Sequence, residues 1–259
     1  LLKPDDIHLY HDRGVMRYMM EDVDGAIQDF TTALQIDPSI TEAYFSRGLA
    51  YASKKQFDDA INDYSSAIKL NPMFQSAYYN RGVNRSSKGD LEGAIADYST
   101  SIKLKPDHQK SFYNRGITRY DSGDLQGALS DFNEAVRLDP DDDSAYGNRG
   151  LVQHQLGNYQ AAIADATEAI ELNPKKHNGY NNRALSRRAI GDLLGALQDY
   201  ETAEKLTPDS YEIFNNRGTV YLVMGDLDTA IAHYEKALQL NPQLAFPYAN
   251  RSVIHHMRG

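Results

Sequence analysis

Apolar residues recur along the chain at the three- and four-residue spacing of amphipathic helices, in paired blocks separated by polar turns. In the stretch 75–104 the first block carries Tyr78 and Val83, and the second carries Leu91, Ile95 and Tyr98. Each block has one apolar stripe, so it predicts a helix that must cover that stripe with a neighbour. We therefore expect an all-α fold made of helix pairs.

The helix pairs repeat with a strict period. Each copy closes with a proline, and consecutive closing prolines lie 34 residues apart in the sequence. They are Pro4, Pro38, Pro72, Pro106, Pro140, Pro174, Pro208 and Pro242. A fixed period of this length is typical of a solenoid, in which each repeat stacks on the next. We number positions within a repeat so that the proline is position 32.

This numbering predicts the organisation of the chain. Residues 1–6 would end a preceding repeat, and 245–259 would form the first helix of an eighth. The full repeats between them are 7–40, 41–74, 75–108, 109–142, 143–176, 177–210 and 211–244. We expect both ends to be cut from a longer array.

The turn inside each repeat has its own pattern. Repeats 3 to 7 have glycine at position 15, which suits a left-handed helix end, followed by Asp or Asn as an N-cap. The glycines are Gly89, Gly123, Gly157, Gly191 and Gly225, and the caps are Asp90, Asp124, Asn158, Asp192 and Asp226. Repeats 1 and 2 have Glu21 and Lys55 at this turn, so we expect weaker caps there.

Small residues at positions 8 and 20 predict close approach of the two helices. Together with an aromatic residue at 4 and 24, Ala at 27 and Pro at 32, they make the sequence resemble the tetratricopeptide repeat family over nearly its whole length. The resemblance implies a right-handed superhelix of antiparallel helix pairs, whose first helices line a concave groove that holds a partner peptide. The departures are Ala166 at position 24, Ser101 at 27 and Glu204 at 28.

Charged residues recur at two further positions. Position 7 is Arg in every copy: Arg13, Arg47, Arg81, Arg115, Arg149, Arg183, Arg217 and Arg251. Position 23 is Asp29, Asp63, Asp97, Asp131, Asp165 and Asp199, and then His233. We expect a structural ladder of ion pairs, within a repeat or between repeats, because an arginine packed between helices needs a carboxylate. The alternative is a basic track for an acidic partner. His233 predicts an exception at Arg217.

Asparagine recurs at position 6, which the resemblance places in the groove. The row consists of Asn80, Asn114, Asn148, Asn182, Asn216 and Asn250, and it is similar to the row in the repeat region of O-GlcNAc transferases. A carboxamide both donates and accepts hydrogen bonds, so a row of them can hold a peptide backbone of any sequence. The alternative is that these amides hold neighbouring repeats in register.

Position 5 gives the groove two different halves. It is Phe45, Tyr79 and Tyr113 in repeats 2 to 4 and then Gly147, Asn181 and Asn215. Aromatic anchors commonly dominate binding energy, so we expect the three rings to contribute to specificity, unless they only cover one another.

The clamp with which some family members bind acidic chaperone tails needs Lys at 5 and Asn at 9. That clamp is absent, since position 9 is apolar or Thr219.

Composition narrows the possible functions. The net charge of −9 disfavours nucleic acid as a partner, and no stretch is apolar enough for a membrane span. Cysteine is absent, so thiol chemistry is excluded and the compartment stays open, with the cytoplasm as the expectation. The close histidines, His8 with His11 and His255 with His256, lack the further ligands of a metal motif, and we expect no cofactor.

We predict a non-catalytic scaffold that binds a partner peptide or protein in the groove. One alternative is an architectural subunit that packs by its outer face or its ends, with self-association as one form. Another is the substrate-recruiting region of a larger enzyme.

Overall fold

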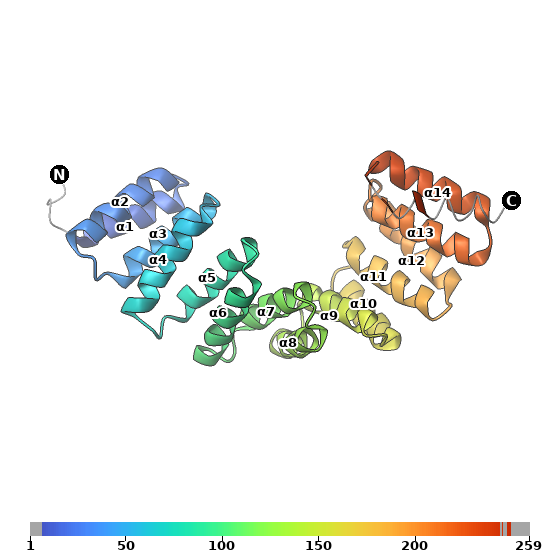
Figure 1. Ribbon diagram of the computed structural model, residues 1–259, viewed down its shortest axis with the longest axis horizontal. Helices are drawn as coiled ribbons and strands as arrows, with labels where there is room; N and C mark the ends of the chain where they lie inside the picture. The colour runs from blue at the N-terminus through green and yellow to red at the C-terminus, as the bar shows by residue number, and fades with distance from the viewer. Residues whose placement is uncertain (1–6, 244, 246–247, 250–259) are drawn as a thin grey trace. The chain divides into compact units, whose positions relative to one another are not determined.

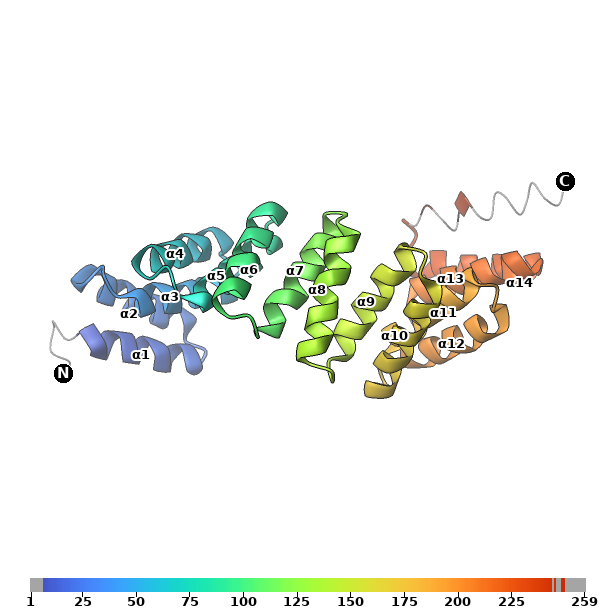
Figure 2. The same ribbon diagram turned by 90° about the horizontal axis from the view of Figure 1, so that it is seen from below.

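The computed structural model describes residues 7–243, 245, 248 and 249, and these contain fourteen α-helices and no strand. The chain divides into two compact units, Leu1–Leu138 (unit 1) and Asp139–Gly259 (unit 2), which are described separately. Within each unit, consecutive helices lie side by side as pairs (Figures 1 and 2). The expected all-α solenoid of helix pairs is confirmed.

Unit 1 has eight described helices in four pairs. They are α1 (Ile7–Met19), α2 (Val23–Ile36), α3 (Thr41–Ser53), α4 (Phe57–Leu70), α5 (Gln75–Ser87), α6 (Leu91–Leu104), α7 (Gln109–Asp121) and α8 (Leu125–Leu138).

Unit 2 has six described helices in three pairs. They are α9 (Asp143–Gln155), α10 (Tyr159–Leu172), α11 (His177–Ala189), α12 (Leu193–Leu206), α13 (Tyr211–Met224) and α14 (Leu227–Leu240). None of the helices in the described residues is both long enough and apolar enough to cross a membrane.

The turns inside the pairs follow the sequence pattern with two corrections. The five glycines at position 15 have φ between 80° and 86°, and Glu21 and Lys55 are forced into the same region at 64° and 60°. The expected weakness in repeat 1 is limited to Glu21, because Asp22 still caps α2 by accepting a hydrogen bond from the Gly25 amide at 3.0 Å. Asn158 does not cap α10, since its side chain instead donates to Gln153.

Tight helix contacts form the core of each pair. A Cβ atom added to Gly82 would lie 2.9 Å from the ring of Tyr98, which explains why only a small residue fits at position 8. The aromatic rings at position 24 are at most 1% exposed: Phe30, Tyr64, Tyr98, Phe132, Tyr200 and Tyr234.

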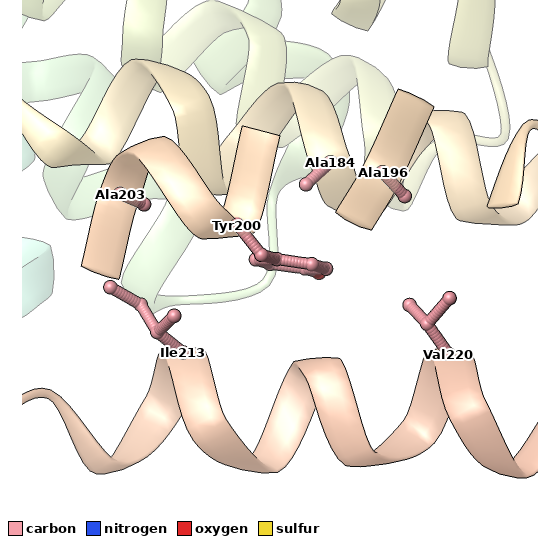
Figure 3. Close-up of a cluster of buried hydrophobic side chains, with 6 residues drawn as sticks. All are labelled: Ala184, Ala196, Tyr200, Ala203, Ile213 and Val220. Atoms are coloured by element: carbon pink, nitrogen blue, oxygen red, sulfur yellow. The ribbon is translucent and has the colours of Figure 1, made fainter. Parts of the chain in front are cut away.

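The rings at position 24 also join neighbouring pairs. In unit 2, Tyr200 projects from α12 toward α13, where it packs with Ile213 and Val220 (Figure 3). Because each pair needs the next one to cover such a ring, stacking supplies the core that a single pair lacks.

Ser101, which departs from the family pattern at position 27, packs against a second unusual residue, Ser111. Ser101 and Ser111 are fully buried where α6 meets α7, and their hydroxyl oxygens lie 2.7 Å apart. The other repeats have apolar residues or glycine at the position of Ser111. Ser101 also accepts a hydrogen bond from the Gln75 amide, and Ser111 contacts the His108 imidazole, so the two hydroxyls belong to a short buried hydrogen-bond chain.

Candidate functional site

The position-7 arginines lie inside the repeats. In repeat 3 the Nε and Nη2 atoms of Arg81 donate to the two carboxylate oxygens of Asp97 at 2.9 and 2.7 Å. The same bidentate pairing joins Arg13 to Asp29, Arg47 to Asp63, Arg115 to Asp131, Arg149 to Asp165 and Arg183 to Asp199. The carboxylates are nearly inaccessible, with Asp97 at 3% exposed. This arrangement favours the structural ladder over a basic track.

The third nitrogen of these arginines links neighbouring repeats. The Nη1 atom of Arg81 donates to the Ser65 hydroxyl at 2.9 Å, and that of Arg47 donates to Thr31 at 3.0 Å. Both hydroxyls belong to position 25 of the preceding repeat. These hydroxyl residues were not among the predicted site residues, although Ser and Thr recur at this position in the sequence.

A second arginine reinforces the carboxylate in four repeats. In repeat 3, Arg85 donates to Asp97 at 2.9 Å and lies 3.5 Å from Asp90. The equivalent residues Arg17, Arg119 and Arg187 contact Asp29, Asp131 and Asp199 in the same way. The hydrogen bond to Asp199 raises the pKa of Arg183, because it favours the charged guanidinium.

Repeat 7 has the exception expected from His233. Arg217 forms its ion pair with Glu204 of α12, and its buried Nε atom has no hydrogen-bond partner. The imidazole stacks on Tyr221 with a centroid distance of 5.2 Å. Burial, and then the charge of Arg217, lower the pKa of His233 to about 4, so the ring is neutral at neutral pH. A pocket of about 470 Å³ lies beside it.

The carboxamide row, Asn80 to Asn216 in the described residues, lies half-buried on the first helices. Within the units its amides contact position 5 of the preceding repeat. Asn114 donates to the Tyr79 hydroxyl at 3.0 Å, Asn182 to the Gly147 carbonyl at 3.1 Å and Asn216 to Asn181 at 3.3 Å. Asn80 instead donates to the Ser76 carbonyl of its own helix. Asn250 falls outside the described residues.

These contacts use only part of each carboxamide. The Oδ1 atoms of Asn80, Asn114 and Asn182 accept no hydrogen bond from described residues, and they are not among the buried unpartnered atoms. They therefore remain accessible to solvent or to a ligand. In Asn114 and Asn182, one amide hydrogen connects two repeats while the acceptor stays open.

The three aromatic residues at position 5 are half-buried and pack on other rings. The ring centroids of Phe45 and Phe74 lie 4.8 Å apart, and those of Tyr79 and His108 lie 4.9 Å apart in an edge-on contact. Tyr113 lies 5.9 Å from Phe132. Phe74 and His108 occupy position 34 of their repeats and extend the aromatic row. The sequence signal for them was a ring at the last position before the next helix.

The described residues contain no group of three or more side chains suited to hold a metal ion. His255 and His256 lie outside these residues. The first helices can contact a ligand through hydrogen bonds and apolar side chains.

Comparisons with known proteins agree with this architecture. Family models described as tetratricopeptide repeat match residues 17–64, 113–177 and 211–244, and one described as TPR repeat matches 48–83 and 86–123. Together these matches cover most of the chain. No curated protein matches it.

Three similar solved structures illustrate the fold. A tetratricopeptide repeat protein from Parabacteroides merdae is 18% identical, with a TM-score of 0.71, covering 96% of this chain and 98% of that one. YrrB, described as a TPR protein with an unusual peptide-binding site, is 21% identical, with a TM-score of 0.60 and coverages of 73% and 97%. The Cut9–Hcn1 hetero-tetramer of the APC/C is 17% identical, with a TM-score of 0.72 and coverages of 97% and 48%. At these identities the likeness concerns the fold.

Proposed function

Because the chain belongs to the tetratricopeptide repeat family, we propose that it is a non-catalytic scaffold that binds an extended segment of a partner protein. Within a unit, the segment would lie along the first-helix face, which we define as positions 5, 6, 9 and 12 of that unit's first helices. Phe45, Tyr79 and Tyr113 would contact its side chains, and the carboxamide row would contact its backbone.

The observation that carries the proposal is the open Oδ1 atoms of Asn80, Asn114 and Asn182. Each of these three amides already donates to a neighbour or to its own helix, so its orientation is fixed before a ligand arrives. A fixed acceptor loses little conformational entropy on binding. Each hydrogen bond contributes only about 0.5–1.5 kcal/mol, so several in succession are needed for useful affinity.

Two similar proteins support the same class of function. YrrB is described as having an unusual peptide-binding site, and Cut9 is part of a hetero-tetramer with Hcn1. The resemblance of the carboxamide row to that of O-GlcNAc transferases, drawn from the sequence, belongs to the same proposal.

The test compares carboxamides on two faces. A triple substitution of Asn114, Asn148 and Asn182 by Ala is assayed for binding to a random peptide display library and compared with wild type. The matched control replaces Gln28, Asn62 and Gln198, three exposed carboxamides at position 22 of the second helices. The proposal expects the first variant to lose peptide binding and the control to keep it.

Equal binding by both triple variants would contradict the groove proposal. Loss of binding only in the control variant would favour the architectural alternative, in which a partner contacts the outer face. The circular dichroism of both variants serves as the check on folding.

A further inference from the structure

Arg188 differs from every other arginine in the described residues. All the others form an ion pair with Asp or Glu, including the exposed Arg137 with Glu134 and the exceptional Arg217 with Glu204. Arg188 has no such pair and no hydrogen bond to a described residue. In a chain of net charge −9, a guanidinium without a carboxylate is unusual.

The position of Arg188 places it on the first-helix face. It occupies position 12 on α11, seven residues after Asn181 and three after Leu185, so the three side chains lie along one stripe of the helix. Position 12 carries no cation elsewhere in the described repeats, where it is Tyr18, Ala52, Ser86, Tyr120, His154 and Leu222. Arg188 is therefore a local feature of unit 2.

The surroundings of Arg188 are neutral and polar. Burial, and then the nearby charge of Arg188, lower the pKa of His154, so its imidazole is uncharged at neutral pH. Positions 5 and 6 of α11 and α13 on this face are Asn181, Asn182, Asn215 and Asn216, which carry no charge. Among the described residues, no carboxylate pairs with the guanidinium.

Partial burial makes the missing ion pair of Arg188 energetically unfavourable. Arg188 is half-buried, and a guanidinium has five N–H donors that lose water as the side chain is covered. A ligand that brings a carboxylate supplies charge-assisted hydrogen bonds, which are about twice as strong as neutral ones. A ligand without a carboxylate would remove water from the guanidinium without pairing its charge, which costs desolvation free energy.

We propose that the first-helix face of unit 2 selects a partner segment with an acidic side chain, and that Arg188 pairs with that carboxylate. The inference rests on the proposed function, because the segment lies on the same face. Charge complementarity is its basis: the face has one unpaired cation among neutral amides, so it favours one Asp or Glu in an otherwise uncharged extended peptide.

The test uses an array of twelve-residue peptides, acetylated and amidated to remove the terminal charges. Each sequence is made with Asp or Glu and with the matching Asn or Gln. Binding to the full chain is measured for wild type, for Arg188→Gln and Arg188→Lys, and for Arg137→Gln as an outer-surface control. We expect wild type to bind acidic members about tenfold more tightly than their amide partners.

The variants test whether Arg188 causes the preference for acidic peptides. The acidic preference should vanish in Arg188→Gln, persist in part in Arg188→Lys and be unchanged in Arg137→Gln. An acidic preference that survives in Arg188→Gln would overturn the inference.

The two proposals fail differently. If wild type binds peptides, and the variant at Asn114, Asn148 and Asn182 does not, but acidic residues give no advantage, only the inference about Arg188 is wrong. If wild type binds no member of the array, both are wrong.

Discussion

Arg217 forms its ion pair with Glu204 of the preceding second helix, whereas its counterparts pair with an aspartate of their own repeat. His233 occupies the aspartate position, and the buried Nε atom of Arg217 is left without a partner. The repeat-7 contact is thus the least satisfied of the ion pairs in the described units.

Replacing His233 by Asp should stabilise repeat 7. The new carboxylate would accept the Nε and Nη2 hydrogens as Asp97 does in repeat 3. Charged hydrogen bonds contribute more than the lost ring stacking, so we expect a gain of about 1 kcal/mol. Hydrogen exchange of the α13 and α14 amides measures it. His233→Asn, which has the shape without the charge, should gain less, and equal protection in both variants would contradict the ion-pair explanation.

The stability of repeat 7 should also depend on His233 through pH. The folded-state pKa is about 4, below the ordinary histidine value of 6.5, so the unfolded chain binds the proton first as pH falls. The contribution of His233 is therefore complete above pH 6.5 and is lost toward pH 4. The protection of α14 amides should decline across this window in wild type and decline less in His233→Gln. An identical decline in both would assign the effect to other groups.

The buried serines should behave as a coupled pair. Ser101→Ala or Ser111→Ala removes the hydrogen bond between the two hydroxyls, although the remaining serine keeps Gln75 or His108 as a partner, so each change should cost about 1 kcal/mol. The double variant loses this shared hydrogen bond only once, so its cost should fall below the sum of the single costs. Urea unfolding of the four proteins in a double-mutant cycle measures this coupling. Additive costs would show that the 2.7 Å contact is not an energetic pair.

Lys55→Gly should stabilise the turn between α3 and α4. Lys55 has φ of 60°, a conformation that costs most residues about 1 kcal/mol or more and glycine very little. The reverse change, Gly89→Lys, should cost a similar amount, since a Cβ atom added to Gly89 would meet no atom within 4 Å. The midpoints of urea unfolding should move in opposite directions. Movement in the same direction would rule out backbone conformation as the cause.

The fold was predictable because its evidence is local and repeated. The 34-residue period, the glycines at position 15 and the small residues at position 8 each fix a helix boundary or a close contact. The pairing of Arg81 with Asp97 was also predictable, since both residues recur at constant positions. A single repeat contains all the information these features need.

The candidate site was less predictable because its contacts cross between repeats. The sequence did not reveal that Asn114 donates to Tyr79, that Ser65 receives Arg81, or that Arg188 lacks a carboxylate. Such relations depend on how one helix pair is placed on the next, which single positions do not encode. The same geometry explains why both interpretations of the carboxamide row, register and ligand binding, remain compatible.

The central claim is that a partner segment lies on the first-helix face, and photo-crosslinking tests it most directly. A peptide selected by display is synthesised with a photoreactive side chain, irradiated with the intact chain and mapped by mass spectrometry. We predict crosslinks to the first helices, near Tyr79, Asn114 and Asn182. Crosslinks concentrated on the second helices, near Gln28, Asn62 and Gln198, would contradict the account.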